Sequence, residues 1–135
     1  MKLAALIITH NSEGCVCACL ASCLRFNDQF SEGILVIDNA SSDNTCAAVR
    51  RFPQVQLISN TVNRGFAGAV NQGFHALSDA DAVLILNPDV ELDSPPSLLA
   101  QALDANPEAG AAGGILADPA GNPQRGFFVR RLPTP

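Results

Sequence analysis

The stretch Leu3-Ala4-Ala5-Leu6-Ile7-Ile8-Thr9-His10-Asn11 decides the fold of this 135-residue chain. Its first seven residues form a continuous apolar run that ends in β-branched side chains, which is typical of a strand covered on both faces. Polar residues 9–13 follow without a small-residue cleavage site, so the run does not resemble a signal peptide. The stretch therefore predicts a buried strand whose carboxyl end opens into a polar loop.

Strands and helices are expected to alternate along the rest of the chain. Further strands are predicted over Ile34–Asp38, Val55–Ser59, Ala82–Leu86 and Ala111–Leu116, with Phe127–Arg131 pairing back as one more. Helices are predicted from Ser12 to about Phe26, from Ser41-Ser42-Asp43 to about Phe52, over Gly68–Leu77, and from Ser94-Pro95-Pro96 to about Asn106. This alternation indicates an α/β fold, an α/β/α sandwich with a mostly parallel, Rossmann-like sheet, as one domain over residues 1–135.

The composition excludes several classes of protein. Apolar residues make up 47% of the chain and charged residues 16%, which is not the composition of a disordered chain. No uncharged apolar run approaches the ~20 residues of a membrane span. Eight Lys and Arg against thirteen Asp and Glu give a net charge of −5, and Trp and Tyr are absent. Nucleic acid is therefore not an expected partner, because a basic surface and stacking platforms are both missing.

Five cysteines are crowded toward the start of the chain, at Cys15, Cys17, Cys19, Cys23 and Cys46. A spacing of four residues places the first, third and fourth of them on one helical face. A metal or redox cluster is one interpretation, but zinc-ligand spacing and a CxxC pair are lacking, which favours packing of a helix on the sheet. So many unpaired thiols indicate a reducing compartment, hence the cytoplasm.

Short polar side chains follow four of the predicted strands, where α/β sheets bind their ligands. They lie in Thr9-His10-Asn11, Asp38-Asn39-Ala40-Ser41-Ser42, Asn63-Arg64-Gly65 and Asn87-Pro88-Asp89. Because the carboxyl ends of parallel strands meet at one edge of the sheet, these segments predict a ligand site there.

The residue types at these strand ends indicate an anionic nucleotide ligand. The Asp38 carboxylate can accept a hydrogen bond from the ring N–H of a pyrimidine base, or it can serve as a turn residue before the next helix. Arg64 and the amides of its glycine-bearing loop can hold a phosphate. Asn87 and Asp89 offer too few ligands for a protein-only cage, but they suit Mg²⁺ or Mn²⁺ completed by water and a diphosphate. An Asx-type turn is the alternative for that tripeptide.

Taken together, the four segments resemble a known family. Ile7-Ile8-Thr9-His10-Asn11, Val36–Asp43, Asn63–Gly68 and Leu86–Val90 closely resemble motifs of the inverting family 2 glycosyltransferases of the GT-A fold, in the rhamnosyltransferase-like branch. The resemblance implies that the nucleotide-sugar donor is bound by Thr9, Asn11, Asp38, Asn63, Arg64, Gly65 and Asn87. It implies that Asp89 is the metal ligand of the DxD motif, in which Asn87 here replaces the first Asp.

The resemblance also implies a reaction: inverting transfer of a hexose or a deoxyhexose such as rhamnose from a UDP- or dTDP-sugar to a saccharide or lipid-linked acceptor, in bacterial polysaccharide biosynthesis. The general base is expected beyond Pro135, since the chain has no Glu-Asp dipeptide, so no catalytic residue is assigned within it. We expect the donor-binding part of a GT-A domain truncated at the C-terminus, without its acceptor-binding half. We expect it to be cytoplasmic, peripheral at the inner face of the membrane, and able to form a homo-oligomer through an exposed sheet edge.

Three other functions were weighed against this one. A non-catalytic nucleotide-binding module fits the same residues and lacks only the general base. A dehydrogenase is disfavoured because the loop after Thr9 has no GxGxxG sequence, and a receiver domain is disfavoured because Thr9-His10-Asn11 is not an acidic cluster.

Overall fold

Four parallel strands form the central layer of the structure, a computed structural model that describes residues 1–124. The strands are β1 (Leu3–Thr9), β2 (Ile34–Asp38), β3 (Val55–Ser59) and β4 (Ala82–Leu86). They lie in the order β3-β2-β1-β4, with every neighbouring pair parallel. The four predicted strand ranges are therefore confirmed, and the first one lies inside the sheet.

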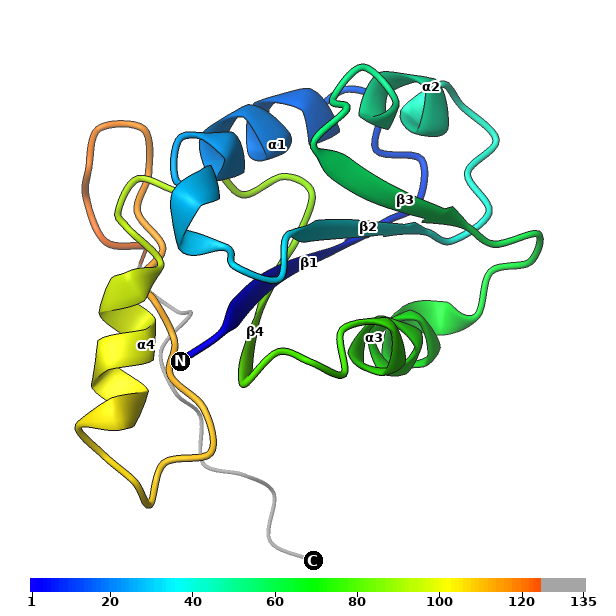
Figure 1. Ribbon diagram of the computed structural model, residues 1–135. Helices are drawn as coiled ribbons and strands as arrows, with labels where there is room; N and C mark the ends of the chain where they lie inside the picture. The colour runs from blue at the N-terminus through cyan, green and yellow to red at the C-terminus, as the bar shows by residue number, and fades with distance from the viewer. Residues whose placement is uncertain (125–135) are drawn as a thin grey trace, which may run out of the picture.

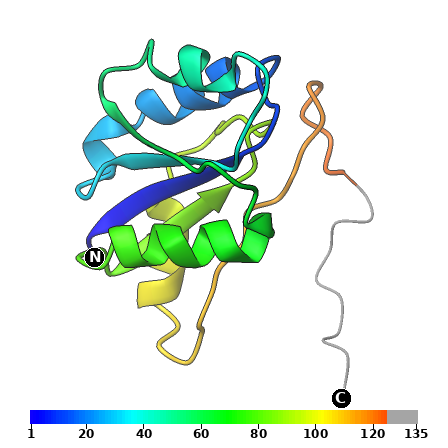
Figure 2. The ribbon, with the colours of Figure 1, turned by 90° about the vertical axis from the view of Figure 1, so that its right-hand side faces the viewer.

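Helices cover both faces of this sheet, which confirms the predicted sandwich (Figure 1). They are α1 (Val16–Leu24), the short 3₁₀ helix η1 (Asn27–Gln29), α2 (Thr45–Val49), α3 (Gly65–Ala76) and α4 (Ser97–Asp104). The turned view shows α1 and α2 on one side of the sheet and α3 on the other (Figure 2). None of the helices within residues 1–124 is both long enough and apolar enough to cross a membrane.

The central strand β1 explains why the first apolar run is continuous. All seven of its residues are buried, and alternate side chains enter two separate clusters. Leu3, Ala5 and Ile7 pack with α1, whereas Ala4, Leu6 and Ile8 pack with α3. Each large aliphatic side chain buried in this way contributes roughly 1.5–3 kcal/mol. Because the side chains of β1 fill both clusters, the strand has no place for a polar residue before Thr9.

The cysteines of α1 take part in the packing that their spacing predicted. Cys19 and Cys23 are buried in the cluster between α1 and the sheet, and Cys17 packs against it. They lie beside Val16 and Leu20, so the four-residue spacing marks the buried face of the helix.

Several helix boundaries differ from the predicted ones. The first helix begins at Val16, with Cys15 and not Ser12 as its N-cap residue, and Ser12 only accepts the Cys15 and Val16 amides on its backbone carbonyl. The second ends early, at Val49. The third begins already at Gly65, whose φ of +72° suits glycine at the point where the chain turns into the helix. The last is preceded by Pro96, with no cap from Ser94.

The predicted fifth strand over Ala111–Leu116 is wrong. Those residues are exposed and form no ladder, and Ile115 is 78% exposed. Gly113 and Gly114 give the segment no side chains to bury, so nothing holds it against β4. An antiparallel bridge between Ala117 and Pro123 closes the turn that follows this segment. The predicted strand Phe127–Arg131 lies outside the described residues.

A glycine inside α3 sets how closely this helix approaches the sheet. An added Cβ at Gly73 would lie against the end of the Leu6 side chain, 2.6 Å from its Cδ1 atom. Leu6 is fully buried in β1, so its side chain has no room to move away. The absence of a side chain at position 73 therefore allows α3 to pack directly on the central strand.

We predict that Gly73→Ala destabilises the fold by about 1–3 kcal/mol, because overpacking against Leu6 outweighs the better helix propensity of alanine. Urea unfolding followed by circular dichroism measures the change. Gly68→Ala on the same helix is the matched control. Its methyl group would meet only the Cβ of the exposed Arg64, at 3.2 Å, and stability should change little. Equal stability of Gly73→Ala and the wild type would contradict this account of the packing.

Candidate functional site

The strand register brings the predicted polar segments to one end of the sheet. Thr9 pairs with Asp38, and Asp38 pairs with Ser59, so β1, β2 and β3 end level with one another. Leu86, the last residue of β4, pairs with Ile7. We call the four loops that leave this end the edge loops: residues 10–15, 39–44, 60–64 and 87–90. They contain or adjoin every residue predicted from the sequence to bind a nucleotide or a metal.

The Asp38 carboxylate is buried beneath the edge loops. It is 1% exposed, and the Thr9 hydroxyl donates a hydrogen bond to its Oδ1 atom at 2.9 Å. The Ser41 amide donates to Oδ2 at 2.9 Å, and the Ser41 hydroxyl also donates to Oδ1. Burial alone would raise the pKa of Asp38, but the hydrogen bonds from Ser41 and Thr9 outweigh it and hold that pKa below its ordinary value. The carboxylate is therefore ionised at neutral pH.

The loop after β1 is hydrogen-bonded to the loop after β2. The exposed Asn11, in the left-handed region with a φ of +50°, accepts a hydrogen bond from the Ser42 amide on its side-chain oxygen at 2.8 Å. Its own amide donates to the Ser41 hydroxyl at 2.8 Å. The Ser12 amide donates to the Thr45 hydroxyl at 2.7 Å. In this arrangement Asn11 lies at the surface, while Thr9 is fully buried and acts by orienting Asp38.

Asn39 ties the loop after β2 to the loop after β3. Its side chain is 3% exposed; the oxygen accepts a hydrogen bond from the Arg64 amide at 2.9 Å, and the nitrogen donates to the Gly65 carbonyl at 3.1 Å. Asn60 reaches the same oxygen and forms a reciprocal amide pair with Gln72 of α3. The sequence pattern identifies Asn39 only as one of the polar residues that follow the second strand. Its position directly after the strand-end Asp38 is the signal that could have singled it out.

Asn63 and Arg64 form the approach to α3. The Asn63 side-chain oxygen accepts the Gly65 amide at 2.8 Å, which stabilises the turn into the helix. Arg64 is exposed, and it is the only Lys or Arg in the edge loops. These loops also hold Glu13, Asp43 and Asp89, so Arg64 supplies an isolated positive charge in an acidic region.

Asn87 and Asp89 lie exposed in a turn after β4. The Asn87 carbonyl accepts the Val90 amide at 3.2 Å and the Cys19 thiol at 3.6 Å, so the turn is anchored on α1. Burial, and then the charges of Asp89 and Asp43, raise the pKa of the Cys15 thiol. The loops after β4 and β2 thus both approach the start of α1.

The side-chain oxygens of Asp89 and Asn87 suit a divalent cation for which the protein supplies only some of the ligands. Within residues 1–124, no three His, Cys, Asp or Glu side chains gather as a metal-binding group. One exposed carboxylate with a neighbouring amide oxygen, from Asn87, offers hard oxygen ligands and leaves most positions of the ion open. Mg²⁺ is commonly bound in this way, through one or two carboxylates plus water and phosphate oxygens.

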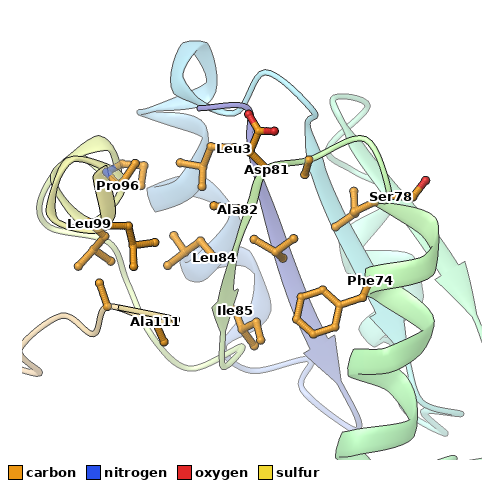
Figure 3. Close-up of a pocket in the computed structure, with 17 residues that line it drawn as sticks. Leu3, Phe74, Ser78, Asp81, Ala82, Leu84, Ile85, Pro96, Leu99 and Ala111 are labelled. Carbon is orange, nitrogen blue, oxygen red and sulfur yellow. The ribbon is translucent and has the colours of Figure 1, made fainter. Parts of the chain in front are cut away.

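A separate hollow of about 490 Å³ lies between α3, β4 and α4 (Figure 3). The labelled side chains around it are mostly apolar; they include Phe74 of α3, Leu84 and Ile85 of β4, and Leu99 of α4. No predicted site residue lines the hollow. The chemistry-bearing residues are therefore at the carboxyl end of the sheet and not in this cavity.

Three solved structures share this fold, and one of them is a mannosyltransferase. TarS from S. aureus in complex with UDP matches 78% of this chain and 32% of its own, with a TM-score of 0.61 and 24% identity. The mannosyltransferase PcManGT from Pyrobaculum calidifontis, in complex with GDP-Man and Mn²⁺, matches 72% of this chain and 30% of its own (TM-score 0.60, 24% identity). Glucosyl-3-phosphoglycerate synthase from Mycobacterium tuberculosis, with Mn²⁺ and UDP, matches 76% and 38% (TM-score 0.61, 16% identity). These likenesses confirm the GT-A fold.

Sequence comparison identifies the family. Two strains of Mycobacterium tuberculosis hold a similar protein, N-acetylglucosaminyl-diphospho-decaprenol L-rhamnosyltransferase, which is 36% identical over 103 residues. The match takes in 66% of this chain and 33% of the relative, so the chain spans about a third of the length of these relatives. The family model described as glycosyl transferase family 2 matches residues 4–130. With nearly its whole length matched, the chain belongs to glycosyl transferase family 2.

Proposed function

We propose that this chain is the donor-binding part of a glycosyltransferase and holds a nucleoside-diphosphate sugar across the edge loops. The observation that carries the proposal is the convergence of Asp38, Arg64 and Asp89 at one end of the sheet, although they lie in three separate segments of the sequence. A carboxylate for the base, a cation for the phosphates and a metal ligand are the three groups that such a donor requires.

The diphosphate is the leaving group of the transfer, and negative charge develops on it in the transition state. A divalent cation, when bound, stabilises this charge electrostatically. Asp89, with Asn87 beside it, would hold the cation, and Arg64 would neutralise part of the remaining phosphate charge. The region is otherwise acidic, so an anionic donor without the cation would meet repulsion from Asp43 and Glu13.

The base would be recognised at Asp38. An ionised carboxylate offers about four acceptor positions, and Thr9 and Ser41 occupy three of them. The ring N–H of uracil or thymine would take the fourth, which requires the loop after β2 to shift and admit the base, because Asp38 is only 1% exposed. Thr9 therefore contributes to the site by fixing the carboxylate, and Asn11 by fixing the Ser41–Ser42 turn above it.

The names of relatives support the chemistry of the donor and the acceptor. The similar rhamnosyltransferases carry rhamnose and a decaprenol-linked sugar in their name, and the solved neighbours include complexes with UDP and with Mn²⁺. We therefore propose a UDP- or dTDP-linked hexose or deoxyhexose such as rhamnose, Mg²⁺ or Mn²⁺, and a saccharide or lipid-linked acceptor. An acceptor of that kind would place the protein at the cytoplasmic face of a membrane. No residue of this chain is assigned as the base that activates the acceptor hydroxyl.

We predict that the chain binds UDP or dTDP in the presence of Mn²⁺, and at least tenfold more weakly without it. Isothermal titration calorimetry with each nucleotide, with and without Mn²⁺, makes the measurement. A parallel assay for hydrolysis of the nucleotide sugar separates a catalytic domain from a binding module. Failure to bind either nucleotide, with or without the metal, would sink the proposal.

Asp89→Ala should reduce Mn²⁺-dependent nucleotide binding by at least tenfold and leave the circular dichroism spectrum unchanged, because Asp89 is exposed. Asp104→Ala is the matched control. It removes the same charge from the exposed surface of α4, outside the edge loops. Unchanged Mn²⁺-dependent binding in Asp89→Ala would place the metal site elsewhere.

Asp38 also makes stability depend on pH. Because its pKa in the folded protein lies below the ordinary value of 3.8, the carboxylate stabilises the fold above that value and loses its contribution as the pH falls through the lowered pKa. Asp38→Asn keeps the shape of the side chain, and the Thr9 and Ser41 hydroxyls can reverse to accept its amide protons. We predict that the free energy of unfolding, measured by urea unfolding at each pH, falls more steeply between pH 5 and pH 2 in the wild type than in Asp38→Asn. If the free energy of unfolding falls equally with pH in both proteins, groups other than Asp38 cause the loss of stability in acid.

A further inference from the structure

Asn39 has a hydrogen-bond partner at every polar group. Its backbone amide donates to the Thr9 carbonyl at 2.7 Å, and its backbone carbonyl contacts the Nδ1 atom of His10 at 2.9 Å. Its side-chain oxygen accepts the Arg64 amide, and its side-chain nitrogen donates to the Gly65 carbonyl. One buried residue therefore joins the end of β1, the end of β2 and the start of α3.

The two hydrogen bonds of the Asn39 side chain hold the backbone at Arg64, the only Lys or Arg of the edge loops. Both are made to the backbone around Arg64, whose own side chain is exposed. Residues 61–67 around it are all exposed, so apart from the local bond between Asn63 and the Gly65 amide, the turn depends on Asn39 and not on buried side chains of its own. The packing of Ala69 and Val70 places α3 on the sheet, and Asn39 adds a direct buried bond between the start of that helix and Asp38, the residue that precedes Asn39.

We propose that Asn39 is a positioning residue: it holds Arg64 at a fixed place beside the base-binding carboxylate, so that one ligand reaches both. The proposal rests on the function proposed above, and it names Asn39 as the link between recognition of the base and of the diphosphate. A neutral amide suits this task, because it can accept one backbone bond and donate the other without adding negative charge next to a phosphate.

A double-mutant cycle on UDP affinity, in the presence of Mn²⁺, tests the link. Arg64→Ala is expected to weaken UDP binding about tenfold, as the loss of a charge-assisted contact does. Asn39→Ala should weaken it at least fivefold in the wild-type background and less than twofold in the Arg64→Ala background, because the cation that it positions is already gone. Equal losses in the two backgrounds, or unchanged affinity in a folded Asn39→Ala protein, would overturn the proposal.

Loss of stability must be separated from loss of positioning. Ser22→Ala is the control, because Ser22 is also buried and hydrogen-bonded, to the Cys19 carbonyl and the Leu92 amide, but lies in α1. It should lower stability and leave UDP affinity within twofold. If Asn39→Ala does not fold, Asn39→Ser, which retains a smaller polar group, takes its place in the same cycle with the same expected outcomes.

Hydrogen exchange provides a readout that needs no ligand. The Arg64 amide is bonded to Asn39, whereas the Gly65 amide is bonded to Asn63. In Asn39→Ala the Arg64 amide should exchange at least tenfold faster by NMR, while it stays protected in Ser22→Ala; an unchanged rate in Asn39→Ala would contradict the positioning. Absence of UDP binding by the wild-type chain would instead contradict the proposed function, and amide exchange would still decide whether Asn39 holds the loop.

Discussion

The hydrogen bonds to the buried Asp38 carboxylate are the interaction on which the rest of the site depends. A charge removed from water costs several kcal/mol unless it is fully hydrogen-bonded, so the loops that supply the donors must hold their places. Thr9 donates from the end of β1 and Ser41 from the loop after β2. The hydrogen-bonded chain continues from the Ser41 hydroxyl to the backbone amide of Asn11, whose side-chain oxygen accepts the Ser42 amide. The ionised Asp38 carboxylate therefore holds the loops after β1 and β2 in place above it.

Some polar groups at this end of the sheet hold the loops together, and others are left exposed for a ligand. Amides and hydroxyls, from Asn11, Asn39, Ser41 and Asn60, connect one loop to another within the protein. The carboxylates of Glu13 and Asp43 also join the loops after β1 and β2, whereas the exposed side chains of Arg64 and Asp89 make no hydrogen bond within residues 1–124 and stay available to a ligand. Such a division keeps the framework independent of the ligand, as expected of a site whose geometry exists before binding.

Sequence reasoning located the strands and the end of the sheet that carries the site, because both follow from local patterns. Continuous apolar runs identified β1 and β4, and polar residues directly after the strands identified the edge loops. The segment Ala111–Leu116 shows where such reasoning fails. An apolar run forms a strand only when a neighbouring strand pairs with it, and the sequence does not show that β4 makes no such pair. The role of Asn39 was missed for a related reason. Its partners, Arg64 and Gly65, are 25 and 26 residues away, and only the fold brings them together.

Mapping UDP and Mg²⁺ onto the ¹⁵N-labelled chain by NMR tests the central claim most directly, that separate loops at the carboxyl end of the sheet form one nucleotide site. The account predicts that the amide shifts cluster in residues 9–13, 38–45, 60–65 and 87–90. Shifts confined to the hollow lined by Phe74, Ile85 and Leu99, with the edge loops unchanged, would contradict it.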